Sequence, residues 1–160
     1  MKELNLHIGI RIYTYEELDA ADRELIDAAR EATHRSYAPY SHFSVGAAAR
    51  LADNTVVCGS NQENAAYPSG LCAERTTLFY ANSRYPDQAV TTLAIAARNE
   101  RGEFLDDPIP PCGACRQVML ETEVRYRQSM RILLYGRKGI YEVEKVGDLL
   151  PLSFDASAMQ

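Results

Sequence analysis

Tryptophan is absent from this 160-residue sequence, histidine occurs only three times and cysteine only four times. Four cysteines are too few for a small domain stabilised mainly by disulfide bonds. We therefore expect reduced thiols that are free for thiolate chemistry or metal binding. No apolar run approaches the length of a membrane span, and no basic flank with an apolar signal core lies near the start. These absences predict a soluble cytoplasmic protein that has no membrane partner.

Positive charge is also scarce, with 17 Lys and Arg against 22 Asp and Glu and a formal net charge of −5. This is the wrong sign for a protein that binds phosphate backbones, so we expect no nucleic-acid partner. The hydrophobic share of 46% and the charged share of 24% are ordinary for a folded domain. The length fits a single domain over residues 1–160 with one core.

The pattern of segments predicts an α/β fold. Apolar and polar residues alternate from about residue 4 to 12, which predicts a half-buried strand as an N-terminal extension. Thr14 and Glu17 have capping-box spacing, and we expect the following helix to end near Thr33. Further strands are expected at 43–51, 55–58, 91–97, 131–135 and 140–143, helices at 72–84 and 112–126, and a helical turn at 147–150. Alternating helices and strands indicate helices packed on a sheet.

Two short runs carry the candidate chemistry. In residues 110–115, Pro-Pro-Cys-Gly-Ala-Cys, two prolines end the preceding chain and a helix begins. Cys112 and Cys115 are three residues apart, so both sulfurs would project from one side of the first turn, as two ligands of a tetrahedral metal must. Cys72, at a second predicted helix start, would complete a three-ligand site. Three protein ligands leave the fourth position of zinc open, which is typical of catalytic zinc.

Glu74 is the residue expected to transfer protons at this predicted metal site. It follows Cys72 by two positions, so its carboxylate would stand beside the metal and move protons without being a ligand. The signature of zinc deaminases is a first ligand, one residue and Glu, followed later by Pro-Cys-x-x-Cys. Residues 72–74 and 111–115 match it. We therefore expect a zinc-dependent deaminase.

Three other residues are expected to be structural. Cys58 lies in a strand pattern, and we expect a small core residue there rather than a fourth metal ligand. Phe79 and Phe104 are likewise expected to be core aromatics.

Several runs resemble cytidine deaminases of the small homotetrameric type. They are residues 40–47, 61–67, 72–76 and 149–154, and the similarity extends from about residue 15 to 154. It implies a three-layer α/β/α fold with a central mixed five-stranded sheet. It also implies one zinc ion per subunit, held by Cys72, Cys112 and Cys115, with proton transfer by Glu74.

The same resemblance implies which residues contact the substrate. They are Phe43, Asn61, Glu63, Tyr67 and Ala73. Asn61 and Glu63 would bind the ribose hydroxyls, Phe43 would lie against the nucleoside, and the backbone of Ala73 would face the pyrimidine carbonyl. Tyr67 would shape the pocket, and Phe154 would enter a neighbouring subunit's site. Asp155 departs from the family pattern, which usually has Gly there, and leaves the path of the tail open.

Arg75 is the second candidate catalytic residue. Zinc with three thiolates carries one net negative charge and is a weak acidifier of water. Two helix N-termini and the Arg75 guanidinium would offset that charge. An ion pair at an interface is the alternative role for Arg75.

The expected reaction is hydrolytic deamination of cytidine and 2′-deoxycytidine to uridine and 2′-deoxyuridine plus ammonia, in pyrimidine salvage. Glu63 beside the sugar would repel a phosphate, which favours nucleosides over nucleotides. A deoxynucleotide deaminase, a drug-nucleoside deaminase of the blasticidin type and a closed, non-enzymatic zinc module that also uses Cys58 remain alternatives. A deaminase of RNA or DNA would need a basic channel, against the net charge.

Overall fold

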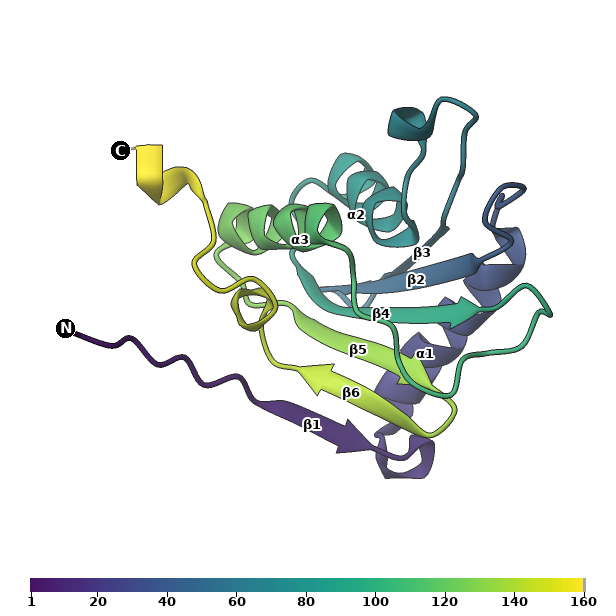
Figure 1. Ribbon diagram of the computed structural model, residues 1–160, viewed down its shortest axis with the longest axis horizontal. Coiled ribbons are helices and arrows are strands. Elements are labelled where there is room, and N and C mark those ends of the chain that lie inside the picture. The colour runs from purple at the N-terminus through teal and green to yellow at the C-terminus, as the bar shows by residue number, and fades with distance from the viewer. Residues whose placement is uncertain (160) are drawn as a thin grey trace.

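The computed structural model describes residues 1–159, which build a mixed sheet between two layers of helices (Figure 1). The strands are β1 (Ile10–Tyr13), β2 (Ser44–Leu51), β3 (Val56–Ser60), β4 (Val90–Arg98), β5 (Arg131–Gly136) and β6 (Gly139–Val143). Their order is β1-β6-β5-β4-β2-β3, and within residues 1–159 only the neighbouring strands β4 and β5 run parallel. The expected α/β/α fold is confirmed, with six strands rather than five because β1 adds to the edge beside β6.

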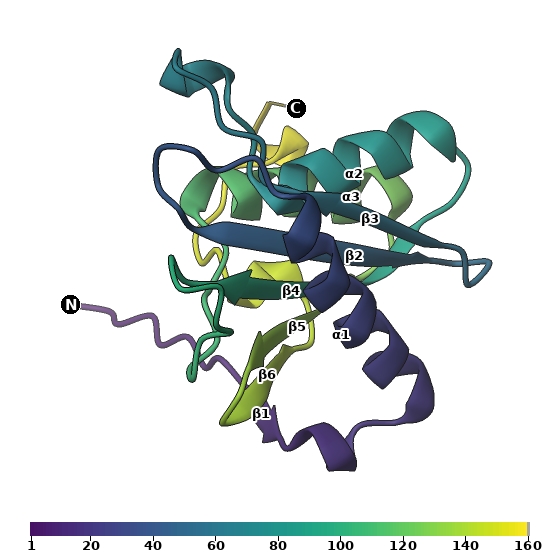
Figure 2. The ribbon, with the colours of Figure 1, turned by 90° about the vertical axis from the view of Figure 1, so that its right-hand side faces the viewer.

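The helices cover opposite faces of this sheet (Figure 2). Helix α1 (Ala20–Ala32) lies on one face, and α2 (Ala73–Arg84) and α3 (Gly113–Tyr126) lie on the other. Alternate residues of β4 serve the two cores: Leu93 and Ile95 pack on the α2 and α3 side, whereas Ala94 and Ala96 pack on the α1 side. None of the helices within residues 1–159 is long and apolar enough to cross a bilayer.

Gly46 of β2 allows α1 to approach the sheet closely. A Cβ at this position would overlap the carbonyl oxygen of Ala29 and lie 2.6 Å from the backbone nitrogen of Thr33. Both obstacles are backbone atoms of the helix and its end, which cannot move aside as a flexible side chain can. The α1 layer therefore depends on glycine at this one position.

A chain of buried charges ties α1 to the β5–β6–β1 side of the sheet. The Asp22 carboxylate accepts hydrogen bonds from Arg131 at 2.6 and 2.7 Å and from Arg50 at 3.2 Å. Arg131 also donates to Glu142 at 3.1 Å, and Glu142 accepts from Arg11 of β1. Asp22 and Glu142 are only 3% and 4% exposed. These pairs fix which face of β1 points toward α1.

The N-terminal prediction was wrong in extent and burial. The strand begins at Ile10 rather than residue 4, and residues 1–9 are exposed without a strand assignment. The reason is topological: Ile10 pairs with Val143, the last residue of β6, so the preceding residues extend past the neighbouring strand. The Thr14–Glu17 capping box exists but caps the short 3-10 turn Tyr15–Glu17. Helix α1 instead begins after Asp19, whose carboxylate accepts from the Asp22 amide at 2.7 Å.

Candidate active site

Three cysteine sulfurs meet where two helices begin. Cys72 is the N-cap of α2, Cys112 is the N-cap of α3, and Cys115 lies in the first turn of α3. The Cys72 and Cys112 sulfurs are 3.9 Å apart, those of Cys112 and Cys115 are 3.4 Å apart, and all three lie within 4.8 Å of one another. Sulfurs around a tetrahedral zinc at a Zn–S distance of about 2.3 Å would be about 3.8 Å apart. The donor set therefore fits zinc in both chemistry and spacing.

The thiol of Cys72 has strong thiolate character. Its hydrogen bond with the Cys115 thiol, followed by one from Arg75, lowers the pKa of Cys72 to about 5. The Arg75 guanidinium nitrogen lies 3.7 Å from the Cys72 sulfur. The same contact with Cys72 raises the pKa of Cys115, because one proton is shared between the sulfurs. Metal binding needs deprotonated sulfur, and the N-termini of α2 and α3 add positive potential that favours it.

Glu74 places a buried carboxyl group beside these sulfurs. It lies in the first turn of α2, is only 4% exposed and is not part of the three-cysteine group. Burial raises the pKa of Glu74, and the charge of Cys72 raises it further. A carboxyl with a raised pKa can both accept and return a proton near neutral pH.

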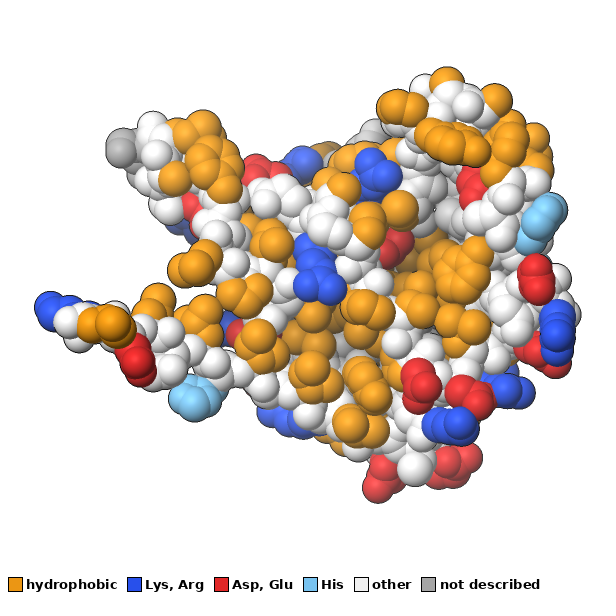
Figure 3. All heavy atoms as spheres, viewed as in Figure 1, with side chains coloured by type: hydrophobic (Ala, Val, Ile, Leu, Met, Phe, Trp, Pro, Cys, Tyr) orange, Lys and Arg blue, Asp and Glu red, His pale blue; other side chains and the backbone are white. Residues whose placement is uncertain are grey.

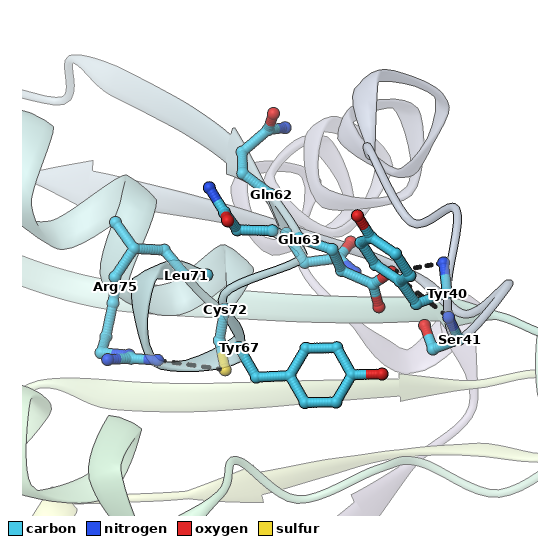
Figure 4. Close-up of a pocket in the computed structure, with 11 residues that line it drawn as sticks. Tyr40, Ser41, Gln62, Glu63, Tyr67, Leu71, Cys72 and Arg75 are labelled. Atoms are coloured by element: carbon cyan, nitrogen blue, oxygen red, sulfur yellow. Dashed lines mark hydrogen bonds between the residues drawn. The ribbon is translucent and has the colours of Figure 1, made fainter.

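A cavity of about 440 Å³ opens beside Cys72, within the range of small-molecule sites. Figure 4 shows Arg75 and Cys72 at one end of this cavity, Tyr40 and Ser41 at the other, and Tyr67 between them. The rings of Tyr40 and Tyr67 meet edge to face, with centroids 5.9 Å apart. The cavity thus joins an aromatic and polar end to the sulfur cluster.

Glu63 lines the polar end of this cavity. One of its carboxylate oxygens accepts from the backbone amides of Tyr40 at 2.9 Å and Ser41 at 3.2 Å. The Ser41 hydroxyl, followed by the Tyr40 amide, lowers the pKa of Glu63. Glu63 is therefore an oriented carboxylate, and both of its backbone hydrogen bonds go to the same oxygen.

Asn61 also lines the cavity, but its amide group holds the surrounding backbone. The side-chain oxygen accepts from the Ser36 hydroxyl at 2.6 Å and the Val45 amide at 2.8 Å. The side-chain nitrogen donates to the Phe43 carbonyl at 2.9 Å. These bonds join the segment after α1 to the start of β2, so Asn61 positions one wall of the cavity.

Phe43 and Phe154 do not line this cavity within the chain. Phe154 is 60% exposed on the C-terminal tail, and its carbonyl accepts from Gln117 at 2.9 Å. Asp155 caps the turn that follows, because its carboxylate accepts from the amide and hydroxyl of Ser157. Ala73 is fully buried at the start of α2. The sequence motifs identified Phe43, Ala73 and Phe154, but none of the three lines the chain's own cavity.

Six cavity residues were not among the site residues predicted from the sequence: Tyr40, Ser41, Gln62, Asn64, Gly70 and Leu71. Tyr40, Ser41 and Gln62 stand in the runs that carry the family resemblance, so position within those runs was the available signal. Leu71 precedes Cys72 directly.

Two expectations about structural residues were wrong. Cys58 is exposed, because β3 is an edge strand, and it lies outside the three-cysteine group. Phe79 is 46% exposed on α2 rather than buried. Phe104 does pack against the core on the α1 side, where it contacts Tyr135 edge to face at 5.5 Å.

Comparisons with known proteins agree with this site. Residues 19–128 match the family model described as "Cytidine and deoxycytidylate deaminase zinc-binding region". A cytidine deaminase of Halalkalibacterium halodurans is 41% identical over 139 residues, covering 86% of this chain and 98% of that protein. One from Sporosarcina psychrophila is 40% identical over 131 residues, covering 82% and 89%.

Solved structures agree as well. The chain resembles a cytidine deaminase from Burkholderia pseudomallei with a TM-score of 0.70 at 40% identity, covering 82% of this chain and 97% of that one. A Mycobacterium tuberculosis cytidine deaminase gives a TM-score of 0.64 at 34% identity, with 86% and 99% covered. The resemblance inferred from the motifs is confirmed, and the chain belongs to the zinc-binding family of cytidine and deoxycytidylate deaminases.

Proposed function

We propose that this chain catalyses the zinc-dependent hydrolytic deamination of cytidine and 2′-deoxycytidine, releasing uridine or 2′-deoxyuridine and ammonia. The observation that carries the proposal is the cluster of Cys72, Cys112 and Cys115 beside the buried carboxyl group of Glu74 and a cavity of nucleoside size. The related cytidine deaminases support the choice of base. The reaction would return free nucleosides to the uridine pool, a salvage role for a cytoplasmic enzyme of one domain over residues 1–160.

Cys72, Cys112 and Cys115 would hold one zinc ion per chain. A zinc ion with three protein ligands lowers the pKa of a water in its fourth position and so supplies a nucleophile at neutral pH. The three thiolates oppose this acidification through their negative charge. Arg75, which contacts Cys72, and the N-termini of α2 and α3 would offset that charge.

Glu74 would carry the protons of the reaction. Its carboxylate would accept a proton from the attacking water and give it to N3 of the cytosine ring, which makes C4 electrophilic. It would then take the proton of the new hydroxyl at C4 and pass it to the C4 amine, which leaves as ammonia while the carbonyl forms. The raised pKa of this buried carboxyl suits a group that must alternate between base and acid.

The other lining residues would select the substrate. The second oxygen of Glu63 is available to accept hydrogen bonds from the ribose hydroxyls, and Asn61 would contribute its remaining N–H to the sugar. Tyr67 would shape the pocket, and the backbone of Ala73 would face the pyrimidine carbonyl. The Glu63 carboxylate would repel a phosphate group on the substrate. Arg75, the cationic residue that lines this cavity, contacts Cys72 and would not offset that repulsion.

Aromatic contacts would come from assembly of the chains. Phe154 is exposed on a tail away from its own cavity, which suits a residue that completes the site of a neighbouring subunit in a homotetramer. Phe43, close to the cavity wall through Asn61, would lie against the nucleoside in that assembly.

The experiment that tests the substrate class compares cytidine, 2′-deoxycytidine and cytidine monophosphate as substrates of the purified zinc-loaded chain. Both nucleosides should be converted, with kcat/KM for the monophosphate at least about tenfold lower, because phosphate is repelled by Glu63. Replacement of Glu63 by Gln should narrow this difference. Equal turnover of the monophosphate would instead indicate a nucleotide deaminase.

A further inference from the structure

The N-terminal segment, residues 3–12, exposes a row of apolar side chains. Each is between 47% and 75% exposed, and they are Leu4, Leu6, Ile8, Ile10 and Ile12. Figure 3 shows this segment extending away from the body, with hydrophobic side chains continuing over the sheet below α3. Monomeric proteins rarely leave contiguous apolar surfaces of this kind uncovered.

The pairing of β1 with β6 fixes where this row points. Arg11 contacts Glu142 on the α1 side of the sheet, so Ile10, opposite Val143, faces the side of α2 and α3. There Ile8 and Ile10 line a groove of about 350 Å³ whose other walls are largely apolar. The groove walls include Pro108, Pro110, Leu134, Tyr141, Leu149 and Pro151.

The segment also presents an open sheet edge. Among residues 1–159, β1 pairs only with β6, and it ends the strand order. No proline interrupts residues 3–12, and lysine is absent from them. Natural edge strands commonly use proline, lysine or bulges to prevent pairing with another strand. An edge without these features is suited to strand addition.

We propose that this edge binds the same edge of a second copy of the chain, antiparallel about a two-fold axis at His7. Between residues 3 and 11 the sequence is symmetric about His7: apolar side chains face apolar ones on one face and Glu3 meets Arg11 on the other, while Ile12 falls opposite Lys2. Self-complementary contacts of this kind are the hallmark of two-fold interfaces. The cross-strand pairs are Glu3–Arg11, Leu4–Ile10, Asn5–Gly9, Leu6–Ile8 and His7–His7.

Charge selects this register over its neighbours. With the axis at Ile8, Arg11 would face Asn5, and with the axis at Leu6, Glu3 would face Gly9. Of these three registers, only the axis at His7 brings Glu3 opposite Arg11, whose side chain is 57% exposed and already contacts Glu142 and Glu144, so Glu3 would be its third carboxylate partner.

The apolar row supplies part of the area that a specific contact needs. The five apolar residues expose on the order of 500 Å² per copy, short of the roughly 800 Å² per partner of a standard interface, so the groove must supply the rest. The partner's Leu4 and Leu6 would lie beside Ile10 and Ile8 at the groove mouth. The family match begins at residue 19, so the N-terminal segment lies outside it.

Disulfide trapping tests the register on the zinc-loaded chain in a Cys58→Ser background, which removes the exposed thiol of β3. In the proposed pairing, His7→Cys places two cysteines directly opposite each other, within reach of a disulfide. The matched control Asn5→Cys places its two cysteines four residues apart along the ribbon, roughly 14 Å, which is too far for a bond. On mild oxidation we expect at least tenfold more linked dimer from the first variant.

A second measurement compares the self-association of two variants at exposed positions of the N-terminal segment. Leu6→Glu should weaken the contact at least tenfold in sedimentation equilibrium, whereas Asn5→Glu, on the other face, should change it much less. Equal cross-linking of the two cysteine variants, or an absence of linked dimer from both, would overturn the proposal. The segment would then pack on its own chain or on a different partner.

Discussion

At the scale of single residues, Arg75 tunes the sulfur cluster. It contacts the Cys72 sulfur and lowers the pKa of that thiol. In Arg75→Gln, the cluster becomes more negative, so the group that must lose a proton for catalysis does so at higher pH. We expect zinc to be retained, kcat to fall about tenfold or more, and the acidic limb of the pH–rate profile to move to higher pH.

The matched control is Arg84→Gln, at the exposed far end of the same helix. It should leave both the rate and the profile unchanged. An unaltered pH profile in Arg75→Gln would show that the guanidinium has only a structural role.

Cys58 distinguishes an open metal site from a closed one. It is exposed on β3 and lies outside the three-cysteine group, so Cys58→Ser should keep its full zinc content and activity. Cys112→Ser, which removes one of the grouped sulfurs, should lose most of its zinc. The check is the zinc-to-protein ratio by elemental analysis. Loss of zinc from Cys58→Ser would instead support a closed four-cysteine module.

The sequence was sufficient to predict the sulfur cluster but not all of the pocket. Cys112 and Cys115 share one helical turn, so their proximity follows from local geometry. The position of Asn61 depends on bonds to residues 36, 43 and 45, which only the tertiary fold brings together. Cys58 was misplaced because alternation along a strand does not show that the strand lies at a sheet edge.

At the scale of elements, the contact of α1 with β2 depends on Gly46. In Gly46→Ala, the added Cβ would meet backbone atoms of the helix, so we expect a loss of about 2–3 kcal/mol or more in the free energy of unfolding. For a chain of this length that corresponds to a Tm lower by roughly 5–10 °C. Thermal unfolding measures it.

Gly147→Ala is the control for this substitution, since nothing lies within 4 Å of its added Cβ. Its Tm should remain near that of the unmodified chain. Equal Tm values for the two variants would contradict the close approach of α1.

The buried charges around Asp22 provide a second test of how α1 is held. Asp22→Ala leaves Arg131 and Arg50 without their shared carboxylate, and breaking such a buried pair costs about 3–5 kcal/mol. Glu144→Ala removes a mostly exposed partner of Arg11 and should change stability little. Denaturant unfolding measures the free energy of unfolding of both variants. Similar decreases in the two would show that the buried ion pairs of Asp22 stabilise the fold no more than the exposed pair of Glu144.

Most elements could be predicted because their signals are local. Helices α2 and α3 and strands β2, β4, β5 and β6 lie within two residues of the expected bounds. The N-terminal strand could not be placed, because its alternation is satisfied equally by burial in the sheet or by contact with another chain. How much of this segment pairs within the sheet depends on where β6 ends, at Val143. The local sequence of residues 4–12 does not contain that information.

At the scale of the whole molecule, the fold brings together residues that are distant in sequence. Cys72 and Cys112 are 40 positions apart, yet α2 and α3 pack side by side on one face with their N-termini adjacent (Figure 1). The β1 edge stands at the far end of the strand order from β3. The groove beside the proposed N-terminal contact nevertheless reaches Pro110, two residues before Cys112, so this groove and the sulfur cluster are neighbours on the α2 and α3 side of the sheet.

The central claim is that three sulfurs hold zinc while Glu74, which is not a ligand, moves the protons. One measurement tests it directly: zinc content and the conversion of cytidine to uridine, determined on the same preparations of the unmodified chain and of Glu74→Gln. We predict about one zinc per chain in both, and a turnover at least about 10²-fold lower in the variant. A variant that keeps its turnover, or that loses its zinc, would contradict the account.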